Sequence, residues 1–184
     1  MLVLAFLFLY KLGDNMATAL QSPFFIDIGF TLTQIGAISK TAGLIAANIG
    51  TIVGGLVMVK LSINRALWVF GFVQIVSILG FALLSVVGTN PWMLGAVVAF
   101  EYLGVGLGAA ALVAFMARTS NPAFAATQLA LFTALASVPR VFATAVTGVI
   151  VEATGWTNFF LLCTALAIPG MLLLFKVAPW NADD

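Results

Sequence analysis

The sequence predicts an all-α integral membrane protein with six transmembrane helices. Hydrophobic residues make up 63% of the chain and charged residues only 7%, whereas soluble domains contain about 25% charged residues. The mean hydropathy is +1.20. The apolar stretches are each about 20 residues long, which is the length that a helix needs to cross the hydrocarbon core. Strands of a membrane barrel would be about half as long and would alternate in polarity.

The predicted spans follow one another with only short connections. Their approximate bounds are 2–24, 34–58, 66–87, 92–117, 126–150 and 158–177. The third and fourth connections contain the helix-breaking sequences Thr-Asn-Pro and Ser-Asn-Pro, which end helices. No soluble domain fits between the spans, so we expect residues 1–184 to form a single six-helix membrane domain.

Basic residues between the spans predict the orientation in the membrane. Lys60 and Arg65 lie in the second connection, Arg118 lies in the fourth, and Lys176 ends the last span. The first, third and fifth connections contain no basic residue. Because basic loop residues stay in the cytoplasm, we expect both termini to be cytoplasmic. The first span begins directly at Met1 without a basic flank, so we also expect an incomplete chain.

The residue inventory argues against several function classes. The chain contains no histidine and a single cysteine, Cys163, so a Ser-His or Cys-His catalytic pair and a thiol cluster for a metal ion are impossible. The few charges form no basic patch for nucleic acid. Gly104, Gly106 and Gly108 follow no strand and have the wrong spacing for a dinucleotide site. We therefore predict a protein that is not an enzyme and has no cofactor or metal. Transport is favoured over a channel, because no selectivity-filter loop is visible.

Charged residues inside the predicted spans are the candidate functional residues. They are Lys11, Asp14, Lys40, Glu101 and Arg140. Each costs roughly 2.5–3.5 kcal/mol to insert, so such residues usually pair with each other or line a polar pathway. The helical rise places Asp14 about 18 Å from the start of its span and Glu101 about 14 Å from the start of its own. Both carboxylates are thus expected near the middle of the membrane.

The spacing of these charges leaves two interpretations open. Lys11 and Asp14 are three residues apart on one helix face, so they form either a structural ion pair or part of a proton or substrate site. Glu101 and Arg140 lie on separate helices without a local partner, which favours a functional role. A buried carboxylate can carry a proton and a buried arginine can bind an anion. Lys40 lies near the outer end of its span and can extend to the interface.

Glycine and proline positions predict how the spans pack. Gly50 and Gly54 are four residues apart, as are Gly104 and Gly108. This small-xxx-small spacing favours close packing of transmembrane helices. Pro139 lies inside the fifth span, where it frees a backbone carbonyl and bends the helix, as in transporters near their sites.

Several short blocks of the sequence form a recognisable set: Tyr10–Asp14, Pro23–Phe25, Gly29–Phe30, Gly36–Lys40, Phe100–Leu103, Ala126–Val141 and Glu152–Trp156. They resemble the C-terminal half of the AmpG-type muropeptide permeases, in the major facilitator superfamily. The first four blocks resemble the seventh and eighth helices of that family, and the last three resemble the tenth helix, the eleventh helix and the turn before the twelfth. The resemblance covers nearly the whole chain.

The resemblance implies one half of a carrier of about twelve helices, built from two inverted three-helix repeats. It implies proton-coupled import of anhydromuropeptides for peptidoglycan recycling, across the bacterial inner membrane. It also implies a partner, which is either a missing N-terminal half or a second copy of this chain. One departure is Val59, which stands where the superfamily's loop signature usually has an aspartate.

On this interpretation, Asp14 and Glu101 handle protons, and Arg140 contacts the sugar or the peptide carboxylates with help from other polar side chains. The full set of predicted substrate-binding or proton-coupling residues is Lys11, Asp14, Asn48, Glu101, Gln128 and Arg140. Two alternatives stay open at this point: an acetyl-CoA transporter-like carrier of the same superfamily, and a six-helix membrane interaction protein that does not transport.

Overall fold

A computed structural model describes residues 2–181, except for the side chains of Phe142 and Thr144. Its elements are α1 (Leu2–Ala19), α2 (Gln21–Asp27), α3 (Leu32–Gln34), the π-helix η1 (Ile35–Lys40), α4 (Thr41–Met58), α5 (Ile63–Val87), α6 (Pro91–Thr119), the 3-10 helix η2 (Pro122–Phe124), α7 (Ala125–Thr154) and α8 (Trp156–Val177). Among these residues, six stretches are long and apolar enough to cross a membrane: 2–27, 32–58, 63–87, 91–119, 122–154 and 156–177. The predicted fold class is confirmed.

The helix ends follow from local sequence. Ser62 precedes α5, and its side chain accepts a hydrogen bond from the backbone N–H of Arg65. Asn90 caps α6 in the same way, with Pro91 at the first helical position, where a proline costs no hydrogen bond. Gly88 and Gly155 end α5 and α7 with positive φ angles of 81° and 79°, which only glycine adopts without strain.

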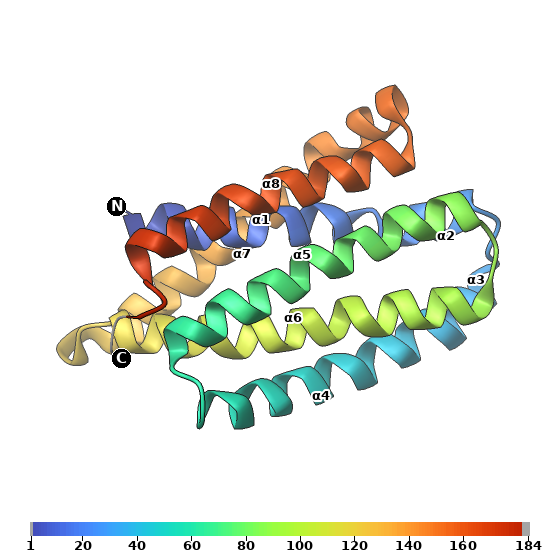
Figure 1. Cartoon of the computed structure of the whole chain (residues 1–184). Coiled ribbons are helices and arrows are strands. Elements are labelled where there is room, and N and C mark those ends of the chain that lie inside the picture. The colour runs from blue at the N-terminus through green and yellow to red at the C-terminus, as the bar shows by residue number, and fades with distance from the viewer. Residues whose placement is uncertain (1, 182–184) are drawn as a thin grey trace.

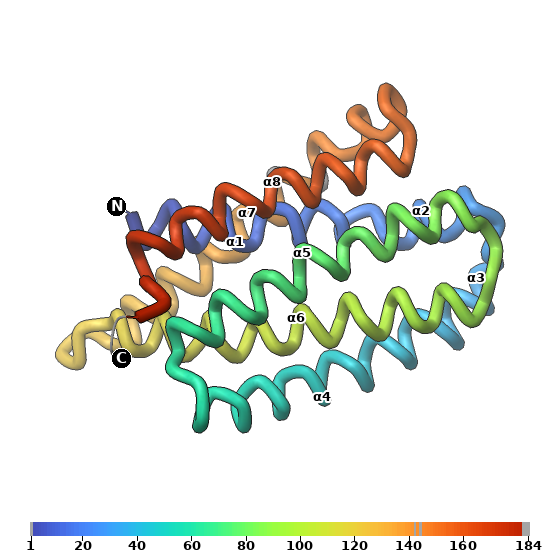
Figure 2. The backbone as a smooth tube through the Cα atoms, viewed as in Figure 1, coloured from blue at the N-terminus to red at the C-terminus, as the bar shows by residue number. Residues whose placement is uncertain are grey.

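The packing of the long helices is symmetric (Figures 1 and 2). Helix α1 packs against α7 and α8, whereas α6 packs against α4 and α5, and α5 also packs against α8. If the chain is divided into the triplets α1, α4, α5 and α6, α7, α8, the first helix of each triplet contacts the second and third helices of the other. Helices α1 and α6 run in opposite directions (Figure 1). Two inverted three-helix repeats have this arrangement.

The two ends of the bundle differ in charge. Both ends of the described chain lie at the same end as the α4–α5 and α6–α7 connections (Figure 1). Arg65 at this end donates to the Trp180 carbonyl over 3.4 Å, and Arg118 donates to Asn64 over 2.6 Å. At the other end, Asp27 accepts a hydrogen bond of 3.1 Å from the Trp156 indole N–H. The basic residues of the connections therefore lie together, although which end faces the cytoplasm stays a prediction.

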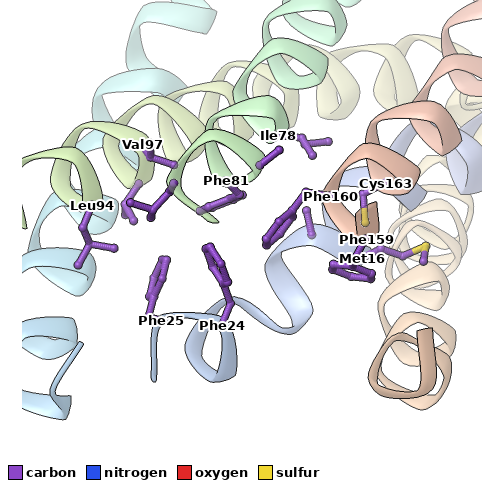
Figure 3. Close-up of a cluster of buried hydrophobic side chains, with 14 of the residues drawn as sticks. Met16, Phe24, Phe25, Ile78, Phe81, Leu94, Val97, Phe159, Phe160 and Cys163 are labelled. Carbon is purple, nitrogen blue, oxygen red and sulfur yellow. The ribbon is translucent and has the colours of Figure 1, made fainter. Parts of the chain in front are cut away.

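Two apolar clusters form the core, one toward each end. The cluster in Figure 3 contains Phe24 and Phe160, whose ring centroids are 4.8 Å apart, together with Phe81. The second cluster is built around Phe6 and Phe115, with centroids 5.4 Å apart. On α1, α5 and α6, the buried residues between the two clusters are polar or glycine. The candidate site lies in this middle layer.

The predicted packing role of the glycines is confirmed. Gly50 and Gly54 lie against α6 around Leu107, and a Cβ at Gly108 would come within 2.7 Å of the Gln74 side-chain nitrogen on α5. A larger residue at Gly50 does not fit unless the helices move apart, and one at Gly54 or Gly108 requires the neighbouring atoms to shift.

Gly50→Ala is expected to destabilise the protein by roughly 1–3 kcal/mol, the usual cost of overpacking. A Cβ at Gly50 would collide with the Leu103 carbonyl oxygen, whereas a Cβ at Gly55 on the same helix would meet nothing within 4 Å. Thermal unfolding in detergent of Gly50→Ala beside the matched control Gly55→Ala measures the effect. Equal midpoints for the two variants would contradict the close approach of α4 and α6.

Candidate functional site

The first part of the site is a buried ion pair on α1. The Lys11 ammonium lies 3.1 Å from Asp14 Oδ2, and the two side chains are 11% and 7% exposed. The predicted pairing across one helical turn is therefore confirmed. It is the only ion pair among the residues that the structure describes. Because of this ion pair, neither charge lacks a partner in the middle of the apolar bundle.

Glu101 on α6 is the second part of the site. Its side chain is fully buried and accepts a hydrogen bond of 2.5 Å from the Ser77 hydroxyl on α5. Lys11 and Asp14 are close enough to act on its charge. The first helices of the two repeats therefore place their carboxyl groups in the same buried layer, between the two apolar clusters.

One oxygen of each carboxyl group has no hydrogen-bond partner within residues 2–181. Asp14 Oδ1 and Glu101 Oε1 are buried and accept no hydrogen bond from any described residue. A carboxyl group only accepts hydrogen bonds when it is ionised, and it can donate one when it holds a proton. These two buried oxygens are therefore available to bind a proton.

Small polar groups surround the carboxyl pair. Asp14 and Gln74 line a cavity of about 10 Å³, which is close to the minimum space for one water molecule. Tyr10 lines the same cavity, and its hydroxyl donates to the Leu67 carbonyl over 3.1 Å. Within residues 2–181, no group of three or more His, Cys, Asp or Glu side chains is placed to hold a metal ion.

Arg140 on α7 belongs to a pocket next to the ion pair. The pocket has a volume of about 250 Å³ and is lined by Lys11, Asn15, Thr133, Ser137, Arg140 and the apolar side chains around them. Arg140 is exposed and has no ion pair or hydrogen bond with the residues that the structure describes. Two cations, an amide and two hydroxyls thus face one hollow, which suits an anionic group with polar neighbours.

A second polar pocket lies farther along the bundle, toward the end opposite the termini. It has a volume of about 330 Å³, and its polar lining residues are Gln21, Ser22, Ser39, Lys40 and Tyr102. The Tyr102 hydroxyl donates to Gln21 over 3.0 Å, and its ring lies against the backbone of Gly43. Two contacts therefore hold the ring in place. Lys40 is exposed at the end of the π-helix, a distortion that is frequent at functional sites.

The other two predicted site residues lie apart from this cluster. Asn48 is exposed on α4, and its side chain donates to the Leu44 carbonyl of the same helix. Gln128 accepts a hydrogen bond of 2.6 Å from the backbone of Asn121 near the start of α7. It is about 18 Å along that helix from Arg140. Their roles in binding stay predictions.

Sequence reasoning missed the uncharged members of the site. Ser77 and Gln74 lie on a span without charged residues in its middle, and Tyr102 directly follows Glu101. A signal was present, because Gln74 and Ser77 are three residues apart and share one face of α5. A polar face in the middle of an otherwise apolar span predicts a contact with another polar group.

The six spans, packed as two inverted three-helix repeats around a buried polar layer, are consistent with one half of a major facilitator superfamily transporter. Relatives of the chain include AmpG-type permeases. It is 43% identical to an anhydromuropeptide permease of Escherichia coli K12 over 174 residues, which cover 94% of this chain. It is 32% identical to a protein of Rickettsia prowazekii that carries the name transporter AmpG 1.

A Haemophilus influenzae protein of uncharacterised function is 50% identical over 98% of this chain. The chain spans 35–44% of the length of these three relatives. No family model matches it. The predicted resemblance to the C-terminal half of an AmpG-type permease is confirmed by these relatives.

Proposed function

We propose that this chain is the substrate-binding and proton-coupling half of a muropeptide importer in the bacterial inner membrane. One observation carries the proposal: the buried carboxyl groups of Asp14 and Glu101 lie next to a pocket that is lined by two cations, and one of these cations, Lys11, is paired with Asp14. The name of the Escherichia coli relative supplies the substrate class. A carrier that moves an anionic substrate together with a proton needs a proton site and an anion site at the middle of the membrane.

The carboxyl pair is the proposed proton site. Asp14 and Glu101 are 5% and 0% exposed, so a proton on them is shielded from bulk water. One oxygen of each has no hydrogen-bond partner among the described residues. Ser77 holds Glu101 in position with its hydroxyl. Carboxyl groups in such settings form proton relays in pumps and transporters.

The two pockets are the proposed substrate surface. A muropeptide combines sugar rings with a peptide that ends in carboxylates. The carboxylates suit Lys11 and Arg140, because a guanidinium binds a carboxylate with two parallel hydrogen bonds. The second pocket, with the Tyr102 ring and the Gln21 amide, suits the sugar. Asn48 and Gln128 belong to this proposal only as contacts at the edges of the surface.

A second half is the proposed partner. In an apolar 18-residue window of each span, only 22% of the span that contains α4 and 19% of the span that contains α7 is buried within this chain. These two helices carry the exposed residues Asn48 and Arg140. In the proposed assembly an N-terminal half, or a second copy, faces these helices across the substrate, with both termini of this chain in the cytoplasm.

Ligand-induced stabilisation tests the proposal. A ligand that binds the folded protein at about 100 times its Kd adds roughly 2.7 kcal/mol of stability, which corresponds to about 5–10 °C in Tm for a protein of this size. We expect an anhydromuropeptide to produce this shift in purified protein. Acetyl-CoA at the same concentration is the control for the alternative carrier. A shift with acetyl-CoA alone, or with neither ligand, would overturn the proposed substrate class.

A further inference from the structure

Lys11 belongs to two sites at once. Its ammonium lies 3.1 Å from Asp14 in the buried ion pair, and the same side chain lines the pocket that contains Arg140. No other charged side chain among the described residues is shared in this way between the carboxyl pair and that pocket. Lys11 is therefore the physical connection between the proposed proton site and the proposed substrate site.

The charges of the connected sites balance. When all four groups are ionised, the two cations Lys11 and Arg140 offset the two anions Asp14 and Glu101, and the sum is zero. One carboxylate entering the pocket brings the sum to minus one, and an unbalanced charge inside a membrane is costly. One proton on the carboxyl pair restores zero. Charge balance therefore favours entry of the anion and of the proton together, and Lys11 is the charged group that the two sites share.

We propose that Lys11 exchanges partners during transport. In the empty site its ammonium is bound by Asp14, as the structure shows. A proton that binds to the Asp14–Glu101 pair weakens this ion pair, and the ammonium then binds a substrate carboxylate together with Arg140. Loss of the proton returns Lys11 to Asp14 and releases the substrate. No covalent bond changes, and the inference rests on the proposed function.

The neighbours of Lys11 limit the proton site to the carboxyl pair. Asp14 binds the Lys11 ammonium, Arg140 on α7 lines the same pocket, and Glu101 on α6 is close enough to interact with its charge. Tyr10 shares a cavity with Asp14, and Tyr102 on α6 and Cys163 on α8 lie near Glu101. The hydroxyls of both tyrosines already donate hydrogen bonds. Cys163 is buried among apolar side chains. Helix α5 contributes only neutral groups, Gln74 and Ser77.

If the binding of the proton and of muropeptide is coupled, each changes the affinity of the other by the same factor, so the pH dependence of muropeptide affinity tests the proposal. Muropeptide affinity is measured from pH 5 to 8 by calorimetry on the protein in its transport-competent assembly. We expect the affinity to rise as the pH falls, by up to about tenfold per pH unit for one linked proton. In Lys11→Gln the affinity should be at least about tenfold weaker, and its dependence on pH should be lost.

Two further variants separate the exchange from a structural role. Lys11→Arg keeps the charge and should keep the pH dependence. The double variant Lys11→Gln with Asp14→Asn leaves no buried charge without a partner on α1, so it should fold, yet it should bind muropeptide without pH dependence. If either variant without Lys11 kept the pH dependence of the wild type, the proposal that Lys11 exchanges Asp14 for a substrate carboxylate would be wrong. If wild-type protein bound no muropeptide at any pH, the proposed function itself would fail.

Discussion

Proton-driven uptake by Glu101→Gln is expected to fall at least about tenfold, to the level of passive equilibration. Glutamine has nearly the shape of glutamate and can still accept a hydrogen bond from Ser77, so the packing of α5 against α6 should survive. It cannot take up and release a proton. The measurement is muropeptide accumulation in vesicles under an imposed pH gradient, with wild type and variant at equal protein amounts.

Exchange of substrate without a gradient is the control for this variant. Labelled muropeptide on one side should still exchange for unlabelled muropeptide on the other, because exchange needs substrate binding but no net proton movement. Ser77→Ala removes the hydrogen bond of 2.5 Å and keeps both carboxyl groups, so it should reduce accumulation far less. Undiminished accumulation by Glu101→Gln would remove Glu101 from the coupling role.

Arg140→Ala is expected to raise the apparent KM for muropeptide by more than about tenfold. Losing a charged hydrogen-bond partner in a binding site costs about 2–5 kcal/mol, and each 1.4 kcal/mol is a factor of ten. Arg140 has no ion pair among the described residues, so its replacement should leave no buried carboxylate without a partner. Initial uptake rates over a range of substrate concentrations measure the effect.

Two variants accompany Arg140→Ala. Arg140→Lys keeps the charge but loses the paired hydrogen bonds of the guanidinium, so its KM should lie between those of the alanine variant and the wild type. Lys176→Ala removes an exposed cation that lines neither pocket, and it should leave KM unchanged. An unchanged KM in Arg140→Ala would make Arg140 a structural residue.

The ion pair on α1 was predictable because it is local. Lys11 and Asp14 are three residues apart, and a helix brings such residues onto one face whatever surrounds it. The contact between Ser77 and Glu101 was not predictable, because it joins two helices across 24 positions of the sequence. Whether a polar residue of one span meets that of another depends on how each helix is rotated about its axis.

The separation of Gln128 from Arg140 has the same kind of cause. Both lie on α7, so the sequence placed them on one helix, and the helical rise alone puts them about 18 Å apart. Only the tertiary structure shows the hydrogen bond that joins Gln128 to Asn121. It also shows that Lys11 on α1 lines the same pocket as Arg140.

The sequence by itself determined the class of this protein, its six spans and the ion pair of α1. These features follow from composition, from the length of apolar stretches and from helical periodicity, which are properties of short segments. Only the tertiary structure decided that the carboxyl groups of α1 and α6 share one buried layer, and that Lys11 also lines the pocket of Arg140. Such contacts depend on the rotation and close approach of helices, which the packing of glycines and side chains across the whole bundle sets.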